Sequence, residues 1–296
     1  MKFGIIGNTN KPIVKDVAAN LIDYFRKKHL SFVVHDELGR WMNGIGNRAV
    51  IEDSVLCKDA ELSRRSDILI ALGGDGTMLA AARMVNSQGT PILGVNLGKL
   101  GFLAEVSVDE VNECLDDILA GSYIIEERMA VTARTNRDDK EYFALNEVVV
   151  DRGSSPRVVD LETSVNGEYL ITYAADGIII TTPTGSTAYS LASGGPIVVP
   201  QSKVLTINPI SPHTLTARPV IVPDGSVIRV VIHAGMQPVH ITADGQIEGF
   251  YEPPVEFTMK RAPHLVKLVK RKKRSYFDLL RAKLLWGRDL RLENNE

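Results

Sequence analysis

The sequence predicts an α/β domain followed by an all-β domain. Apolar runs of strand length alternate with helical patterns up to about residue 123, and short β-rich runs separated by turns follow. Alternating strands and helices indicate a parallel, doubly wound (Rossmann-like) sheet, whereas many short strands indicate a β-sandwich. We therefore expect an α/β domain at 1–123 and a β-sandwich at 124–274, with a C-terminal helix at 275–296 that packs back on the first domain.

The elements of the first domain follow from the spacing of apolar residues. Strands are expected at 3–7, 31–35, 68–72 and 91–95, and helices after Pro12, at about 55–65 and from Thr77. Ser107 to Glu110 forms a capping box that begins another helix, which Gly121 ends. The glycine-containing segment 36–53 shows no period, so we expect an irregular or mobile loop there.

The elements of the second domain are short runs rich in β-branched residues. Strands are expected at 130–134, 142–150, 158–165, 178–182, 204–207, 220–222, 228–233 and 239–243. Asn166-Gly167 predicts a hairpin. The basic run 270–274 could bind nucleic acid, but the near-neutral net charge favours a solvated segment before the last helix. Ser275 caps that helix, whose apolar face is expected to contain Phe277, Leu280 and Leu284.

The overall composition is that of a soluble globular protein. Of 296 residues, 44% are hydrophobic and 24% charged, with a formal net charge of −2. This balance gives no sign of nucleic acid or a membrane as partner, and no apolar run approaches the ~18 residues of a membrane span. The cysteines and histidines form no disulfide or zinc pattern. Because Lys2 leads directly into a short strand rather than a signal peptide, we expect a cytoplasmic protein.

The stretch Asp67–Thr77 (DILIALGGDGT) is the centre of the chain. A buried strand leads into Gly73 and Gly74, and a helical pattern begins at Thr77. A glycine turn before a helix places free N–H groups and a positive dipole end where an anion can bind. The carboxylate of Asp75 would repel a phosphate there, unless a metal ion lies between them or the carboxylate takes a proton. Because Asp is also a common turn residue, a purely structural turn is the alternative.

Two later stretches also contain groups suited to a polar ligand. Asn146-Glu147 can donate and accept hydrogen bonds, as a ribose or an adenine edge requires, although a surface turn explains this pair equally well. The hydroxyls and glycines of Thr182–Pro196 offer many donors with little bulk, and Tyr189 adds a surface for a flat base. A mere linker is less consistent with its place between strands. Asp176-Gly177 and Asp244-Gly245-Gln246 add acidic and amide groups at strand ends.

Four motifs of the chain resemble the motif set of NAD kinases. They are GGDGT at 73–77, GxNxGxLGF at 94–102, NE at 146–147 and TPTGSTAYSLASGGP at 182–196, and they occur in the family's order over nearly the whole chain. GGDGT alone is shared with diacylglycerol and sphingosine kinases, so the long fourth motif is the discriminating one. The resemblance implies transfer of the ATP γ-phosphoryl group to the 2′-hydroxyl of the adenosine ribose of NAD, giving NADP. It also implies a divalent metal, expected to be Mg²⁺, and an active site between the two domains.

The resemblance assigns roles by motif position. Asp75 would accept the proton of the 2′-hydroxyl, Asn146 and Glu147 would hold the nicotinamide nucleotide half, and Asp176 would line the dinucleotide pocket. Further nucleotide-binding positions would be Gly73, Gly74, Gly76, Thr77, Asn96, Phe102, Arg157, Ala174, Thr184, Thr187, Ala188, Tyr189, Ser190, Leu191, Ala192 and Gln246. Many members carry a basic residue where this chain has Ala174, which leaves the preference between NAD and NADH open. The family is usually oligomeric, so a homo-oligomer, either a dimer or a tetramer, is expected.

Two other functions stay open on the sequence. A lipid kinase with the same glycine loop would need an apolar cavity, and the Ser/Thr/Gly-rich stretch argues against one. A non-catalytic dinucleotide-binding regulator would gain nothing from the carboxylate of Asp75 beside phosphates. The chain contains no GxxxxGK[ST] P-loop and no protein-kinase motif, which excludes the commonest other phosphotransferases.

Overall fold

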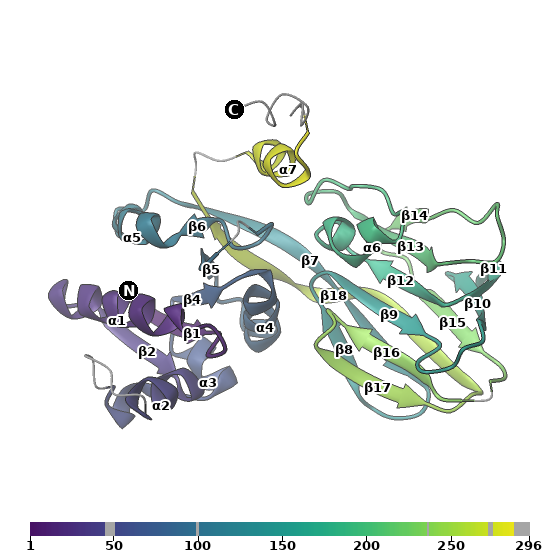
Figure 1. Ribbon diagram of the computed structural model, residues 1–296, viewed down its shortest axis with the longest axis horizontal. Coiled ribbons are helices and arrows are strands. Elements are labelled where there is room, and N and C mark those ends of the chain that lie inside the picture. Colours follow the sequence, from purple (N-terminus) through teal and green to yellow (C-terminus); the bar gives the residue numbers. More distant parts are fainter. Residues whose placement is uncertain (45–50, 99–100, 236, 272–274, 287–296) are drawn as a thin grey trace, which may run out of the picture. The chain divides into compact units, whose positions relative to one another are not determined.

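The computed structural model describes residues 1–44, 51–98, 101–235, 237–271 and 275–286, apart from the side chain of Ala60. The chain forms two compact units (Figure 1). The first unit contains Met1–Met84, Thr90–Glu126 and the chain from Lys267 onward, and the second contains Val85–Gly89 and Glu127–Val266. The domain limits predicted from the sequence stay a prediction. The division into compact units differs from them in placing residues 124–126 and 267–271 with the first unit and Val85–Gly89 with the second.

The first unit is built on the predicted parallel sheet. Its strands lie in the order β3-β2-β1-β4-β5-β6, with bounds β1 (Lys2–Gly7), β2 (Ser31–His35), β3 (Leu56–Cys57), β4 (Ile68–Gly73), β5 (Ile92–Asn96) and β6 (Val106–Ser107). The order reverses between β1 and β4, as in a doubly wound fold. Both Gly73 and Asn96 end their strands and lie opposite each other, so the loops after β4 and β5 leave the sheet at the same edge.

Helices cover both faces of this sheet. Phe3 and Ile5 point to the face that packs against α1 (Ile13–Lys27), α2 (Asp36–Gly44) and α5 (Val111–Leu119) in one buried cluster. On the opposite face, Gly94 lies against Met78 of α4 (Asp75–Val85), since a Cβ at Gly94 would come within 2.7 Å of the Met78 Sδ atom. The doubly wound arrangement expected from the sequence is therefore confirmed.

The expected irregular loop at 36–53 is wrong for residues 36–44, which form helix α2. Gly39 suggested a loop but is buried in this helix, where a Cβ would lie 2.3 Å from the Cδ2 atom of Leu56. The glycine thus serves close packing rather than a turn. Residues 45–50 lie outside the described part of the chain. The helix expected at 55–65 is also shorter, because 56–57 pair with β2 as β3 and leave only α3 (Asp59–Arg64), after the 3₁₀ turn η1 (Asp53–Val55).

The second unit is the predicted sandwich. One layer has the order β11-β10-β15-β18-β7-β8, and the other is a six-stranded sheet with the order β14-β13-β12-β9-β16-β17. A single buried apolar cluster draws residues from both layers, for example Phe257 from β18 and Ile180 from β12. The strand bounds are β7 (Ile124–Thr135), β8 (Glu141–Ala144), β9 (Glu147–Asp151), β10 (Val159–Val165), β11 (Glu168–Ala175), β12 (Gly177–Thr181), β13 (Val204–Ile210), β14 (Val220–Pro223), β15 (Ile228–Ile232), β16 (Val239–Ala243), β17 (Ile247–Tyr251) and β18 (Val255–Lys270).

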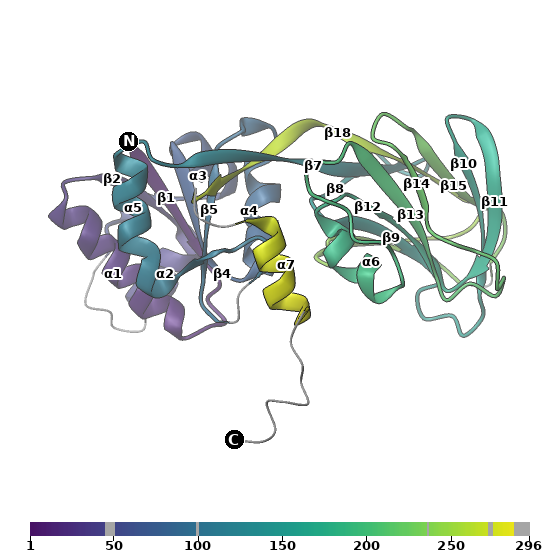
Figure 2. The same cartoon turned by 90° about the horizontal axis from the view of Figure 1, so that it is seen from above.

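Several features of the second unit differ from the sequence-based expectation. The run 142–150 is two strands, β8 and β9, which belong to different layers, with residues 145–146 as their connection. Strands β11 and β17 were not predicted. Strand β18 was not predicted either, because charged residues interrupt its apolar pattern. Figure 2 shows β7 and β18 as the long strands through which the chain leaves the first unit and returns to it.

The short elements include the predicted capping box, which is present as a 3₁₀ turn, η3 (Val108–Glu110), that leads into α5. The other 3₁₀ turns are η2 (Asn86–Gln88) and η4 (Gly185–Thr187), and α6 (Tyr189–Ala192) is a single helical turn. Ser275 caps α7 (Tyr276–Leu284), where its Oγ accepts a hydrogen bond from the N–H of Phe277. No helix in the described ranges is long and apolar enough to cross a membrane.

Helix α7 buries a different face from the expected one. Leu280 is buried as predicted, but its buried neighbour is Leu279, and the side chain of Phe277 is 53% exposed. The helix belongs to the first unit, as expected for a C-terminal helix that packs back on the first domain. There the Lys283 ammonium lies 5.5 Å from the centre of the Phe102 ring. Gly287, which the sequence suggested as the helix end, lies outside the described residues, and Leu285 ends the helix in a left-handed conformation.

Candidate functional site

The glycine loop at 73–77 contains one glycine that packs tightly against a neighbouring side chain and one that has free space beside it. A Cβ at Gly73 would lie 1.9 Å from the Thr77 Oγ1 atom, so this glycine lets the loop fold onto the buried Thr77. A Cβ at Gly74 would meet no atom within 4 Å, and Gly76 is exposed. Helix α4 begins at Asp75, two residues before the predicted start at Thr77. The side from which a ligand could approach the backbone is therefore that of Gly74 and Gly76.

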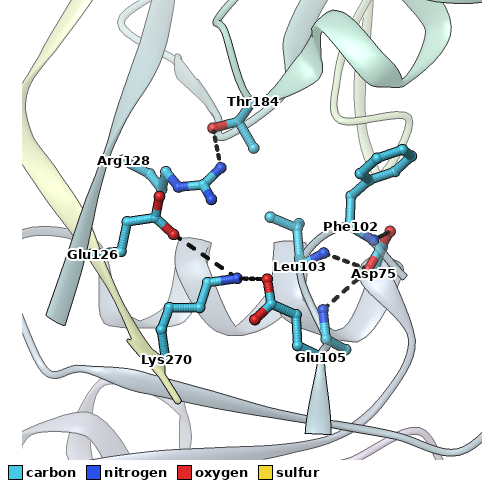
Figure 3. A network of polar contacts seen from close by, with 9 residues as sticks. Asp75, Phe102, Leu103, Glu105, Glu126, Arg128, Thr184 and Lys270 are labelled. Carbon is cyan, nitrogen blue, oxygen red and sulfur yellow. Dashed lines mark hydrogen bonds and ion pairs between the residues drawn. The ribbon is translucent and has the colours of Figure 1, made fainter. Parts of the chain in front are cut away.

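The carboxylate of Asp75 is held by consecutive backbone N–H groups of a distant loop. Its Oδ2 atom accepts a hydrogen bond from the N–H of Phe102 at 2.8 Å, and Oδ1 accepts from Leu103 at 3.0 Å and Ala104 at 3.2 Å (Figure 3). A Cβ at Gly101 would lie 2.0 Å from the Asp75 Oδ1 atom, so only glycine fits there. Asp75 is not a simple turn residue, because a turn would not need this second loop.

The loop that supplies these donors begins at the end of β5. Asn96 is buried, and its amide exchanges two hydrogen bonds with the backbone of Gly98, at 3.1 and 3.3 Å. The N–H of Leu97 donates to the carbonyl of Gly73 at 3.2 Å, which ties the loop to the end of β4. Lys99 and Leu100 lie outside the described residues. In this structure the side chain of Asn96 shapes the loop.

A second aspartate of the chain holds a second loop in the same way. The Asp244 carboxylate accepts hydrogen bonds from the N–H groups of Leu145 at 2.9 Å, Asn146 at 2.8 Å and Glu147 at 3.2 Å. The N–H of Asp244 in turn donates to the carbonyl of Glu147 at 3.0 Å. Asp244 is buried, with a positive φ of 53°. The Asn146-Glu147 pair is therefore a fixed connection between two strands rather than a surface turn.

The carboxyl group of Glu147 lies in an unusual environment. Its side chain is only 6% exposed, and the Oε2 atom has no hydrogen-bond partner among the described residues. Burial, and secondly the nearby Asp244 charge, raise the pKa of Glu147 to about 8. At neutral pH this carboxyl group is therefore largely protonated and able to donate a hydrogen bond.

Most hydroxyls of the 182–196 stretch are used within the protein. Thr182 donates to the carbonyl of Leu145 at 2.6 Å, Ser186 donates to the carbonyl of Pro183 at 2.7 Å, and Ser190 accepts from the amide of Asn208 at 3.2 Å. The hydroxyl hydrogens of Thr182 and Ser186 are thus used within the turn itself, whereas Ser190 only accepts and stays a predicted nucleotide-binding residue. A Cβ at Gly185 would lie 2.3 Å from the Asn146 carbonyl oxygen, so this glycine lets the stretch approach the Asn146-Glu147 connection.

The other residues of this stretch form the short turns η4 and α6. Thr184 is buried, and its Oγ1 accepts a hydrogen bond from the Arg128 guanidinium at 3.3 Å (Figure 3). Thr187 donates to the carbonyl of Thr184 at 3.3 Å. Ala188 and Leu191 are partly buried, and Ala192 is exposed.

A cavity of about 500 Å³ opens in the second unit beside Tyr189. Tyr189 is 46% exposed, and the cavity is lined by Asp151, Arg152, Gly153, Ser154, Asp176, Tyr189, Ile210, Pro238, His240 and Phe250. The Arg152 Nε atom lies 2.7 Å from the Asp176 Oδ1 atom, so the predicted Asp176 is ion-paired at the cavity wall. Aromatic, cationic and carboxylate groups in one cavity are suited to a polar ligand with a flat ring.

Of the predicted positions in the second unit, the lining of this cavity contains Asp176 and Tyr189, and Arg157, Ala174 and Gln246 lie elsewhere. Arg157 lines a smaller one of about 150 Å³, which shares Arg152 with the first. Ala174 is partly exposed in β11 and lines neither of these two cavities. Gln246 is exposed in the turn after Asp244, and its N–H donates to the carbonyl of Ala243 at 3.0 Å.

The sequence did not assign a role to several polar residues around the Asp75 loop. Lys270 and Arg271 were expected in a solvated basic segment, but their side chains are only 7% and 14% exposed. Lys270 forms ion pairs with Glu105 and Glu126 (Figure 3), and Arg271 with Glu110, Glu113 and Asp117. The solvated reading is thus wrong for these two residues, and residues 272–274 lie outside the described part. The signal in the sequence that could have predicted their burial is that the basic run directly follows the mainly apolar residues at the end of β18.

The described residues contain no group of at least three His, Cys, Asp or Glu side chains that could hold a metal ion.

The chain was compared with protein families and curated proteins. A model of the ATP-NAD kinase N-terminal domain matches residues 3–123, and a model of the ATP-NAD kinase C-terminal domain matches residues 145–271. The NAD kinase of Chlorobium limicola is 41% identical over 291 residues, which cover 98% of each chain. That of Geobacter sulfurreducens is 39% identical over 289 residues, which cover 97% of this chain and 99% of the relative.

Solved structures show the same fold. Yeast NADH kinase in complex with NADH superimposes with a TM-score of 0.89 at 24% identity, covering 99% of this chain and 89% of the other. An NAD kinase from Archaeoglobus fulgidus in complex with ATP gives a TM-score of 0.76 at 22% identity, covering 96% and 99%. Both family models match in chain order, and the curated relatives align over nearly the whole chain. The chain belongs to the NAD kinase family.

Proposed function

We propose that this chain transfers the γ-phosphoryl group of ATP to the 2′-hydroxyl of the adenosine ribose of NAD, producing NADP. The single observation that supports this most strongly is the Asp75 carboxylate at the start of α4, fixed by N–H groups of residues 102–104. Unlike a buried carboxylate, the partly exposed Asp75 at a helix start is placed where it can act on a substrate hydroxyl. Family membership supplies the substrate class.

Asp75 acts in this proposal as the acceptor of the hydroxyl proton. Its two oxygens offer about four lone-pair positions, and the loop's N–H groups use three of them. The side chain is also partly exposed, so the remaining position is open to a substrate hydroxyl. In this proposal proton transfer accompanies phosphoryl transfer rather than preceding it, as suits a loose transition state.

The second unit provides the dinucleotide site in this proposal. Asn146 and protonated Glu147 would offer hydrogen bonds to the nicotinamide nucleotide half, and the Tyr189 ring would stack on a base. Asp176 would bind at the cavity wall, where it is paired with Arg152. Residues 187–192, together with Arg157 and Gln246, would complete the contacts.

A divalent metal ion, Mg²⁺ in our proposal, would enter as the complex with ATP. Mg²⁺ is commonly held by substrate phosphates, waters and one or two carboxylates rather than by a cage of protein ligands. The absence of a three-residue ligand cluster in the described residues fits that mode. Mg²⁺ would neutralise charge on the transferring phosphoryl group. We further propose a cytoplasmic homo-oligomer.

The test is the product formed by the purified protein from NAD and ATP with Mg²⁺. We expect NADP, and no phosphorylated diacylglycerol or sphingosine when these lipids replace NAD. Phosphorylated lipid without NADP would contradict the proposal. NADH offered in competition with NAD would settle the preference that Ala174 leaves open.

A further inference from the structure

Among the described residues of the first unit, Lys270 is the most deeply buried cation, and it forms ion pairs. It ends β18, and its ammonium pairs with the carboxylate of Glu105 and lies 3.9 Å from a carboxylate oxygen of Glu126 (Figure 3). With the Lys270 side chain only 7% exposed, this charge is largely removed from water. Burying an ammonium is costly unless it is paired, so the site requires its carboxylates.

The sheet register explains why Lys270 and Glu105 meet. Both β18 and β6 pair in parallel with β5, at Leu268 opposite Ile92 and at Val106 opposite Val95. Lys270 follows Leu268 by two positions and Glu105 precedes Val106 by one. Both therefore fall level with Gly94, at the point where β18 ends and the chain of residues 101–105 enters the sheet.

The residues at this level of the sheet are adjacent to the loop whose N–H groups bind Asp75. Glu105 directly follows Ala104, whose N–H donates to the Asp75 Oδ1 atom at 3.2 Å. Ala104 also lies against Gly94, since a Cβ there would come within 2.8 Å of the Ala104 Cα atom. An ion pair that fixes Glu105 therefore fixes the last residue of the donor loop, one peptide away from the carboxylate that the loop positions.

We propose that Lys270, through its ion pair with Glu105, positions the 102–104 loop against Asp75 and is a positioning residue for phosphoryl transfer. This inference rests on the proposed role of Asp75 as proton acceptor. Lys270 does not contact substrate in this account. Its effect is on the geometry of the carboxylate, which is used in the transition state more than in nucleotide binding.

The first test compares Lys270→Met with Arg271→Met as a matched control. Arg271 is the neighbouring cation and is similarly buried, but its ion pairs go to Glu113, Asp117 and Glu110 on η3 and α5 rather than to the Asp75 loop. We expect Lys270→Met to lower kcat on the order of 10- to 100-fold, as small misplacements of catalytic groups do, with the KM for NAD changed less than about 3-fold. Arg271→Met should leave kcat within about 3-fold.

The second test does not depend on activity. Hydrogen exchange of the amides of residues 102–104 reports directly on their bonds to Asp75. We expect faster exchange in Lys270→Met and unchanged exchange in Arg271→Met. The milder Glu105→Gln, which leaves Lys270 its second carboxylate, should show a smaller increase. Unchanged exchange in a folded Lys270→Met protein would overturn the inference.

The third test places Lys270→Met in an Asp75→Asn background. If Lys270 acts through Asp75, the second substitution should lower kcat less than about 3-fold further. An Asp75→Asn protein with strongly lowered but measurable kcat, in which Lys270→Met still has its full effect, would overturn the positioning role alone. A fully active Asp75→Asn protein would overturn the proposed role of Asp75, and the positioning role with it.

Discussion

The two units each contain an Asp-Gly pair whose aspartate accepts hydrogen bonds from consecutive backbone N–H groups of a distant loop. Asp75 holds residues 102–104, and Asp244 holds residues 145–147. The local chemistry is nearly the same, but Asp75 is partly exposed at a helix start and Asp244 is buried at a strand end. We call each arrangement, a carboxylate bound by three consecutive backbone N–H groups, a clamp. The carboxylate of a clamp can act in catalysis when it is accessible, and it only stabilises the loop when it is buried.

The largest expected effect is that of Asp75→Asn on kcat, and it distinguishes the role of Asp75 from that of Asp244. Asp75→Asn keeps size and one acceptor oxygen but removes the basic carboxylate. We expect kcat to fall roughly 10²- to 10⁴-fold, or about 3–5 kcal/mol, because the carboxylate is needed chiefly in the transition state. Steady-state kinetics at saturating Mg²⁺ measure this. A kcat within a few-fold of wild type would give Asp75 the same scaffolding role as Asp244, and recovery at high Mg²⁺ would make it a metal ligand.

The Asp75 clamp can also be broken from its other side, at Gly101. A Cβ there would lie 2.0 Å from the Asp75 Oδ1 atom, so Gly101→Ala must displace the carboxylate or the loop. We expect kcat to fall on the order of 10²-fold, since misplacement of a catalytic group by about 1 Å has that effect. Gly98→Ala is a suitable control, because a Cβ at Gly98 would meet nothing within 4 Å. Equal losses of kcat in both variants would contradict the clamp argument.

The comparison also predicts which unit governs dinucleotide binding. Tyr189→Ala removes an exposed ring at the cavity of the second unit, and stacking contributes similarly to ground and transition states. We expect the KM for NAD to rise by a factor equivalent to about 1–2 kcal/mol, with kcat nearly unchanged. If the KM does not change, Tyr189 only packs against the sandwich.

Asp244 differs from Asp75 in having a buried acidic neighbour, which gives stability a pH dependence. Burial and the Asp244 charge raise the pKa of Glu147 from its usual value of 4.5 to about 8. The folded state therefore binds more protons than the unfolded state between these values, so this contribution to stability is present below about pH 4.5 and is lost as pH rises through 8. The loss is at most about 1.4 kcal/mol per pH unit.

Denaturant unfolding at several pH values measures this contribution as the difference between wild type and Glu147→Gln, which cannot ionise. The stability of wild type relative to Glu147→Gln should fall between pH 5 and pH 8. A constant difference over this range would show that Glu147 is not the titrating group.

The sequence predicted the local parts of this comparison better than its long-range parts. The strand–glycine–helix unit around Asp75 followed from an apolar run next to glycines, since both signals are local. The partners of Asp75 lie 27–29 residues away, and those of Asp244 lie 97–99 residues away. Periodicity gives the faces of elements but not the register between them, so neither clamp could be derived from spacing.

The loop predicted in place of helix α2 and the donor role predicted for the Thr182 and Ser186 hydroxyls failed for a related reason. A glycine such as Gly39, or a hydroxyl such as that of Thr182, looks the same in the sequence whether it faces solvent, a ligand or another segment. Tertiary packing decides between these cases. In both segments it placed the small or polar groups against the protein itself.

The most direct test of the division between the two aspartates is binding of NAD, without ATP, to Asp75→Asn and Asp244→Asn. Isothermal titration of both variants beside wild type compares the two clamps in one experiment. We expect Asp75→Asn to bind NAD within a few-fold of wild type, because its carboxylate serves the chemical step. Asp244→Asn should weaken binding about 10-fold or more, because the Asn146-Glu147 connection loses its anchor. Weak binding to Asp75→Asn together with normal binding to Asp244→Asn would contradict the account.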